Sequence, residues 1–170
     1  RAAEGGVGAA KCGGNYGGSL YPARLAQQEG YDQLIWTDAK EHLYVEESGT
    51  MNAMFVIDGK LITPAVSSSI LDGVTRKSII AVAEYWNIPV EERRVSVAEI
   101  IDAAKEGRLD AAFGAGTAAV VSPFSHIAYE GVDYALPELT EASFPVRVKD
   151  FLEKLRTGRS EDIFGWNLRV

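Results

Sequence analysis

Residues 8–19 read GAAKCGGNYGGS and hold one lysine, Lys11, among small side chains. A phenol, Tyr16, follows a few positions later. Glycines on both sides of Lys11 permit a close backbone approach and unusual dihedral angles. Most lysines are solvated surface charges, so Lys11 alone could be no more than that. A Walker-type phosphate loop is excluded for this stretch, because its Gly-Lys-Ser/Thr order is missing.

A carboxylate, Glu47, is expected to face the interior. In the expected strand 42–47, alternation places Leu43, Val45 and Glu47 on one face, and the two apolar residues mark that face as inward. Burying a carboxylate costs free energy unless a cation or a strong donor meets it. A protonated pyridine nitrogen would be such a partner. The alternative is an error in the expected register, or a bulge at 48–49, that turns Glu47 outward.

Two glycine–threonine segments are candidates for holding a phosphate. Gly73, Val74 and Thr75 open an expected helix, where unpaired N–H groups and the positive end of the helix dipole attract anions. Residues 114–118, GAGTA, could form a turn whose successive N–H groups face one anion. The alternatives are an ordinary helix start and a glycine-rich sheet corner. Together with a lysine amine and a buried carboxylate, these are the parts needed to hold pyridoxal phosphate (PLP) through a Schiff base.

Composition limits the class of protein. The chain has 170 residues, of which 46% are hydrophobic and 24% charged, which indicates one folded domain with a substantial core. The net charge of −7 gives no basic surface for nucleic acid or an anionic membrane, and no apolar run is long enough to span a bilayer. Cys12, His42 and His126 stand apart, so no metal-binding spacing is present. The opening residues read as the middle of a protein, so we expect a fragment.

Hydrophobic periodicity and turn residues predict a mixed α/β fold. Strands arrive mostly as hairpins with helices between them, so we expect a largely antiparallel sheet, curved around a core and packed with helices. Helices are expected at 19–29, at 72–86, at 96–104 with Ser96 and Glu99 as a capping box, and from 143 to a stop at Gly158. Strands are expected at 33–37, 42–47, 51–57, 60–63, 90–95, 109–113 and 118–122, with a hairpin at 127–134 and a short final strand at 164–166.

Four motifs occur in one order along the chain. They are Lys-x-Gly-Gly-Asn-Tyr at 11–16, Glu-x-Gly-Thr-Met-Asn at 47–52, Leu-x-Gly-Val-Thr-Arg at 71–76 and Gly-x-Gly-Thr-Ala at 114–118. This set resembles the C-terminal large domain of branched-chain amino acid aminotransferases, which are fold-type IV PLP enzymes. The resemblance covers essentially the whole chain, and it implies the C-terminal domain of the D-amino acid aminotransferase-like fold, a curved sheet or pseudo-barrel.

The resemblance implies a catalytic residue and a set of binding residues. Lys11 would be the Schiff-base lysine and proton shuttle, Tyr16 would hydrogen-bond the phenolic oxygen of PLP, and Glu47 would pair with its ring nitrogen. The contacts to the ring and phosphate of PLP and to the substrate would come from the third and fourth motifs. Leu71 would pack on the ring, Gly73, Val74, Thr75 and Thr117 would hold the phosphate, and Thr117 and Ala118 would bind the substrate carboxylate.

The resemblance also implies a reaction and its partners. The parent enzyme would transfer the amino group of leucine, isoleucine or valine to 2-oxoglutarate, as a cytoplasmic homodimer. Residues 1–170 would be its single PLP-binding large domain, without the small N-terminal domain, and by themselves weak or inactive. The alternatives are another fold-type IV enzyme, either a D-amino acid aminotransferase or an aminodeoxychorismate lyase, and a non-catalytic PLP-binding module.

Overall fold

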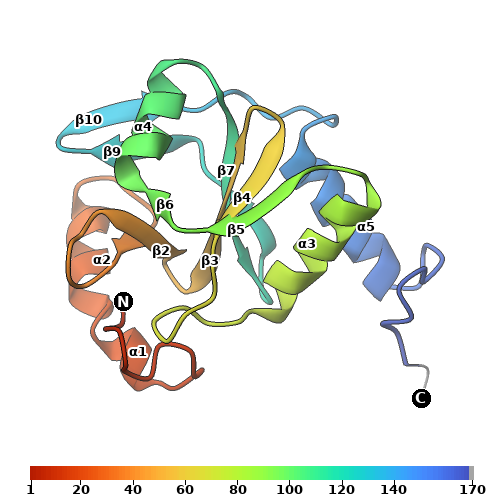
Figure 1. The fold of residues 1–170 in the computed structure, drawn as a ribbon, viewed down its shortest axis with the longest axis horizontal. Coiled ribbons are helices and arrows are strands. Elements are labelled where there is room, and N and C mark those ends of the chain that lie inside the picture. Colours follow the sequence, from red (N-terminus) through yellow and green to blue (C-terminus); the bar gives the residue numbers. More distant parts are fainter. Residues whose placement is uncertain (169–170) are drawn as a thin grey trace.

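A mixed, mostly antiparallel sheet forms the centre of the computed structural model, which describes residues 1–168 (Figure 1). Five strands lie side by side in chain order: β1 (Ile35–Thr37), β2 (Tyr44–Ser48), β3 (Met51–Ile57), β4 (Lys60–Pro64) and β5 (Val90–Arg93). Three more extend the sheet, because β6 (Val95–Ser96) pairs with β2, and β7 (Leu109–Gly116) lies between β3 and β8 (Val120–Pro123). β4 and β5 are parallel, and the other described pairs are antiparallel. This confirms the predicted fold class.

Helices cover both faces of the sheet (Figure 1). The described helices are α1 (Gly14–Gly17), α2 (Leu20–Gln28), α3 (Val74–Tyr85), α4 (Val97–Lys105) and α5 (Phe144–Arg156), of which α1 and α2 belong to neither apolar core. α3 and α5 contribute to one apolar core, and α4 contributes to a second core together with Ile127. Ile127 belongs to the hairpin of β9 (His126–Tyr129) and β10 (Val132–Ala135), which was predicted at 127–134.

The central strand β3 explains why two cores form. Met54 and Val56 belong to the core under α3 and α5, whereas Phe55 and Ile57 belong to the core under α4. Successive side chains of a strand point to opposite faces, so a continuous apolar run supplies both sides at once. β3 therefore holds the sheet between two helical layers.

The sequence predicted one tight turn and one helix cap correctly. Asp58 and Gly59 have φ angles of 50° and 72°, as expected for a tight turn between β3 and β4. The Ser96 hydroxyl accepts the Glu99 N–H at 3.0 Å and so caps α4. The return half of the predicted capping box is not made, because the Glu99 carboxylate is held by Arg93 instead.

The predicted break in the sheet at residues 114–117 is wrong. β7 runs on through Gly116, and the turn falls at residues 117–119. A Cβ at Gly114 or Gly116 would come within 2.6 or 2.9 Å of the Met51 side chain. These glycines therefore make room for Met51 across the β3–β7 pair, and they continue the strand.

Two further predictions are corrected. Leu43 precedes β2 and is 56% exposed, so it does not share the inward face of Val45 and Glu47. The tail at 164–166 forms no strand. Its Phe164 packs instead against the aromatic rings of Tyr85 and Phe151, because these rings offer an apolar site beside α3 and α5.

Candidate functional site

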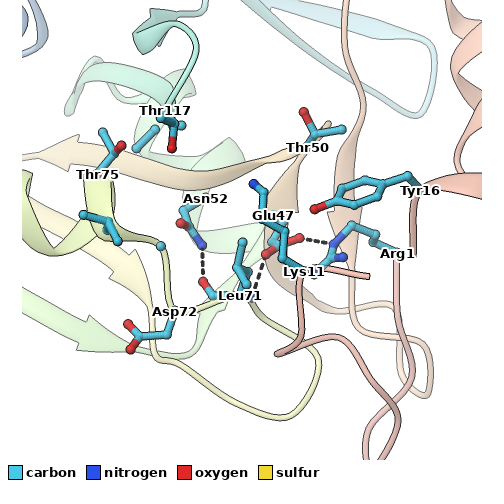
Figure 2. Close-up of a pocket in the computed structure, with 14 residues that line it drawn as sticks. Arg1, Lys11, Tyr16, Glu47, Thr50, Asn52, Leu71, Asp72, Thr75 and Thr117 are labelled. Carbon is cyan, nitrogen blue, oxygen red and sulfur yellow. Dashed lines mark hydrogen bonds and ion pairs between the residues drawn. The ribbon is translucent and has the colours of Figure 1, made fainter. Parts of the chain in front are cut away.

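A pocket of about 210 Å³ gathers residues from four distant parts of the chain (Figure 2). It lies where the N-terminal loop, the β2–β3 strand pair, the start of α3 and the end of β7 meet. Every residue predicted to contact a cofactor lines it: Lys11, Tyr16, Glu47, Leu71, Gly73, Val74, Thr75 and Thr117. Ala118 does not line the pocket and lies in the exposed turn after β7, so the structure does not bring this predicted substrate contact to the site.

The pocket also has lining residues that were not among the predicted contacts. Thr50 and Asn52 belong to the motif at 47–52. Asp72 and Gly116 directly flank predicted residues in the sequence, and Ala115 belongs to the motif at 114–118. Arg1 belongs to none of the four motifs, so the sequence did not indicate a role for it.

Glu47 is the buried carboxylate of the site, with 3% of its surface exposed. It lies on β2 and is buried, so a bulge at 48–49 does not turn it outward. The register of β2 against β1 shifts instead between Val45 and Glu47, because Val45 pairs with Thr37 and Glu47 with Trp36. One carboxylate oxygen accepts the Leu71 N–H at 2.9 Å, and the other forms an ion pair with the Arg1 guanidinium. Burial raises the pKa of Glu47 above its ordinary range, while the Leu71 N–H and Arg1 oppose that rise.

The backbone at Leu71 is held from both sides. Glu47 and Asn52 are direct partners in the β2–β3 register. Glu47 accepts from the Leu71 N–H, and the Asn52 side-chain amide donates to the Leu71 carbonyl at 2.8 Å. A Cβ at Gly73 would overlap the Asn52 Oδ1 atom, so a glycine is needed there. These contacts fix where the loop delivers the start of α3.

The start of α3 provides a site for an anion. Gly73 is its N-cap and is extended, with φ −68° and ψ 134°, and the helix has no side-chain cap. Its first N–H groups are therefore left for another partner. The Val74 side chain is 73% exposed, so Val74 contributes through its backbone. Thr75 and Thr117 add hydroxyl groups on the same side of the pocket (Figure 2).

Lys11 lies in a loop whose backbone is tightly held. The buried Asn15 side chain donates to the carbonyls of Val7 at 2.9 Å and Ala10 at 2.8 Å. Gly8 packs so closely on Ser69 that a Cβ would come within 2.5 Å of its backbone. The Lys11 side chain itself extends into the pocket, and the Tyr16 hydroxyl points the same way (Figure 2). The fixed backbone thus presents the amine of Lys11 to the pocket.

The pocket is chemically polarised. Figure 2 shows Thr75 and Thr117 on one side, Tyr16 and Arg1 on the other, and Asn52, Glu47 and Lys11 between them. It can bind an anion at the helix end and present an amine and a carboxylate in its middle. Among residues 1–168, no cluster of His, Cys, Asp or Glu side chains could hold a metal ion. In the same residues, no helix has the length and apolar character that crossing a membrane requires.

Comparison with known proteins gives matches over the whole chain. Residues 7–127 match the model of the amino-transferase class IV family. The chain is 45% identical to a probable branched-chain-amino-acid aminotransferase of Staphylococcus epidermidis and 38% identical to branched-chain-amino-acid aminotransferase 2 of Bacillus subtilis. Each match covers 100% of this chain but only 48% and 47% of those proteins. The chain thus spans about half the length of the curated relatives it matches.

Solved structures agree with these relatives. The branched-chain amino acid aminotransferase from Escherichia coli has a TM-score of 0.80 at 34% identity, over 98% of this chain and 52% of that chain. The branched-chain amino acid aminotransferase from Thermobaculum terrenum, in its PLP-bound holo form, has a TM-score of 0.79 at 27% identity. That match covers 94% of this chain and 48% of the other.

Proposed function

The chain belongs to the amino-transferase class IV family, and from this we propose that the protein carrying it transfers amino groups between branched-chain amino acids and 2-oxo acids, with PLP as cofactor. The observation that carries the proposal is the pocket itself. It collects Lys11, Glu47 and the uncapped start of α3, which lie far apart in the sequence. Relatives named as branched-chain aminotransferases support the choice of substrate.

The residues of the pocket fit PLP. PLP carries a phosphate, an aromatic ring nitrogen and an aldehyde. The uncapped start of α3 suits the phosphate, with the hydroxyls of Thr75 and Thr117 beside it. Glu47 suits the ring nitrogen, because a buried carboxylate gains most from a partner that carries a proton. When bound, PLP supplies an electron sink for the charge that develops beside the amino nitrogen.

The chain's own residues have distinct tasks in this proposal. Lys11 would hold PLP through its amine, and once the amino group of the substrate has displaced it from the aldehyde carbon, its free Nζ atom would take up and return the proton that moves during the reaction. Glu47 keeps the ring nitrogen protonated, held in place by the Leu71 N–H and by Arg1. The Tyr16 hydroxyl donates to the phenolic oxygen of the cofactor. Leu71 packs on the ring, on a backbone that Glu47 and Asn52 fix.

We also propose that residues 1–170 form one cofactor-binding domain and that a second, smaller domain in the whole protein completes the substrate pocket. The predicted homodimer, the cytoplasmic location and the substrate contacts of Thr117 and Ala118 stay predictions. Weak or absent turnover by the 170-residue chain alone is likewise a prediction. A D-amino acid aminotransferase or an aminodeoxychorismate lyase is the alternative reaction for the same pocket.

A substrate panel tests the proposed function. The whole protein is loaded with PLP and assayed for amino transfer from leucine, isoleucine, valine and D-alanine to 2-oxoglutarate, and separately for cleavage of aminodeoxychorismate. We expect turnover of the three branched-chain amino acids and its loss in Lys11→Arg, which keeps the charge but cannot act as the amine. Preferential use of D-alanine or aminodeoxychorismate, or no turnover by the wild type, would contradict the proposal.

A further inference from the structure

One buried guanidinium, that of Arg1, touches each of the parts that carry the reactive groups. Its side chain is 3% exposed. Its Nε atom pairs with the Glu47 carboxylate. Its Nη2 atom donates to the carbonyl of Gly8 at 2.9 Å, in the loop that carries Lys11, and to that of Ser69 at 3.2 Å, in the segment that leads to Leu71. The guanidinium also lies 6.0 Å from the centre of the Tyr16 ring.

The charge of Arg1 matters because Glu47 is buried. A carboxylate out of water is costly unless a charged or hydrogen-bonding partner is present. Glu47 has one backbone donor, the Leu71 N–H, and one cationic side chain, that of Arg1. The protein therefore provides a resident cation for Glu47 before any ligand arrives. Removing that cation would favour the neutral form of Glu47.

The shape of the guanidinium matters as well. Arg1 pairs with Glu47 through Nε and donates to two backbone carbonyls through Nη2. A lysine offers one compact charge at the end of a flexible stem and cannot reach partners on separate sides in this way. The contacts of Arg1 thus set the distance between the Lys11 loop and Glu47.

We propose that Arg1 is a positioning residue: it holds Glu47 as a carboxylate and fixes it relative to the Lys11 loop. The inference rests on the proposed function in one respect, namely that Glu47 faces the ring nitrogen of PLP. Arg1 acts on that nitrogen through Glu47. With Arg1 in place, a proton shared between the ring nitrogen and Glu47 belongs on the nitrogen. Without Arg1, the proton moves toward Glu47.

A double-mutant cycle on the protein without cofactor tests the contact. Arg1→Met should lower the Tm, because it leaves Glu47 buried and unpaired. The same substitution in the Glu47→Gln background should lower the Tm less, because no charge is then left alone. Arg94→Met is the matched control, since this arginine is exposed and pairs with Glu41 at the surface. Equal Tm losses from Arg1→Met in both backgrounds would overturn the proposal.

A spectroscopic readout tests the effect on the cofactor. PLP with an NMR-active isotope at the ring nitrogen is bound to the wild type, Arg1→Lys and Arg1→Met. We expect the nitrogen resonance to move toward its unprotonated position in Arg1→Met, and part of the way in Arg1→Lys. An unchanged resonance in Arg1→Met with bound PLP would overturn the proposal. If the wild type takes up no PLP, the proposed function fails, and the cycle without cofactor still decides whether Arg1 holds Glu47.

Discussion

The Leu71 backbone shows how single side chains place the site. Glu47 and Asn52 reach it from paired strands, one as acceptor and the other as donor. Each net hydrogen bond of this kind contributes about 1 kcal/mol, and leaving a buried partner unsatisfied costs more. Asn15 does the same for the Lys11 loop through Val7 and Ala10. The reactive groups are thus positioned mainly by side-chain contacts to backbone.

Gly73→Ala tests this arrangement at one residue. The new Cβ would overlap the Asn52 Oδ1 atom. We expect Asn52 to leave the Leu71 carbonyl, with a loss of about 1–3 kcal/mol in the free energy of unfolding and weaker binding of PLP. Chemical denaturation and a PLP titration measure the two effects. Gly18→Ala is the control, because no atom lies within 4 Å of its Cβ position. Equal effects of the two substitutions would contradict the role given to Gly73.

Some residue positions could be predicted and others could not. Alternation around Val45 was enough to place Glu47 inward. The partners of Glu47 could not be predicted in this way, because Arg1 and Leu71 lie 46 and 24 positions away along the chain. Local periodicity carries no information about such contacts. Only the order of the four motifs, read as a family resemblance, predicted that the segments of Glu47 and Leu71 share a pocket. Nothing predicted Arg1.

Among the elements, the β1–β2 connection depends on one carboxylate. Asp38 accepts N–H groups from Tyr44 at 2.9 Å, Glu41 at 2.7 Å and Leu43 at 2.9 Å. This turn fixes where β2 begins and therefore which residues of β2 face inward. The backbone donors, that of Tyr44 first, lower the pKa of Asp38 well below its ordinary value. His42, with a φ of 55°, completes the tight connection.

Asp38→Asn gives a prediction for pH dependence. Because the pKa of Asp38 is lower in the folded state, its stabilising effect is present above the ordinary value of 3.8 and is lost as the pH falls toward the folded-state value. We expect the wild type to have the higher Tm at neutral pH, and the difference to shrink as the pH drops below 3.8. Thermal unfolding across a pH series measures it. A difference that stays constant from neutral to acid pH would show that the ionised carboxylate is not what stabilises the turn.

The elements themselves were largely predictable, and the exceptions have physical causes. β3 was predicted with correct ends, because an apolar run stops at the Asp58–Gly59 turn. β7 was cut short in the prediction, because Gly114 and Gly116 were interpreted as part of a turn that could face an anion. Their true constraint is the Met51 side chain on the neighbouring strand, which no local pattern reveals.

For the whole molecule, the sheet separates two apolar cores, and the pocket lies where four segments converge beside the β2–β3 turn and the end of β7. The mixed antiparallel class followed from hairpin spacing, whereas the family resemblance indicated which residues would converge. Because these segments converge around Lys11, we expect Lys11 to react with PLP in the folded chain differently from the other lysines. The remaining lysines lie outside the residues that line the pocket.

The measurement with most weight is reductive labelling. The protein is mixed with PLP, reduced with borohydride, digested and mapped by mass spectrometry, with excess inorganic phosphate as a competitor and Lys11→Arg as the control. If the pocket is a PLP site, the pyridoxyl group should appear on Lys11 alone, decrease with phosphate and vanish in Lys11→Arg. Labelling spread over the surface lysines, or labelling that persists unchanged in Lys11→Arg, would contradict it.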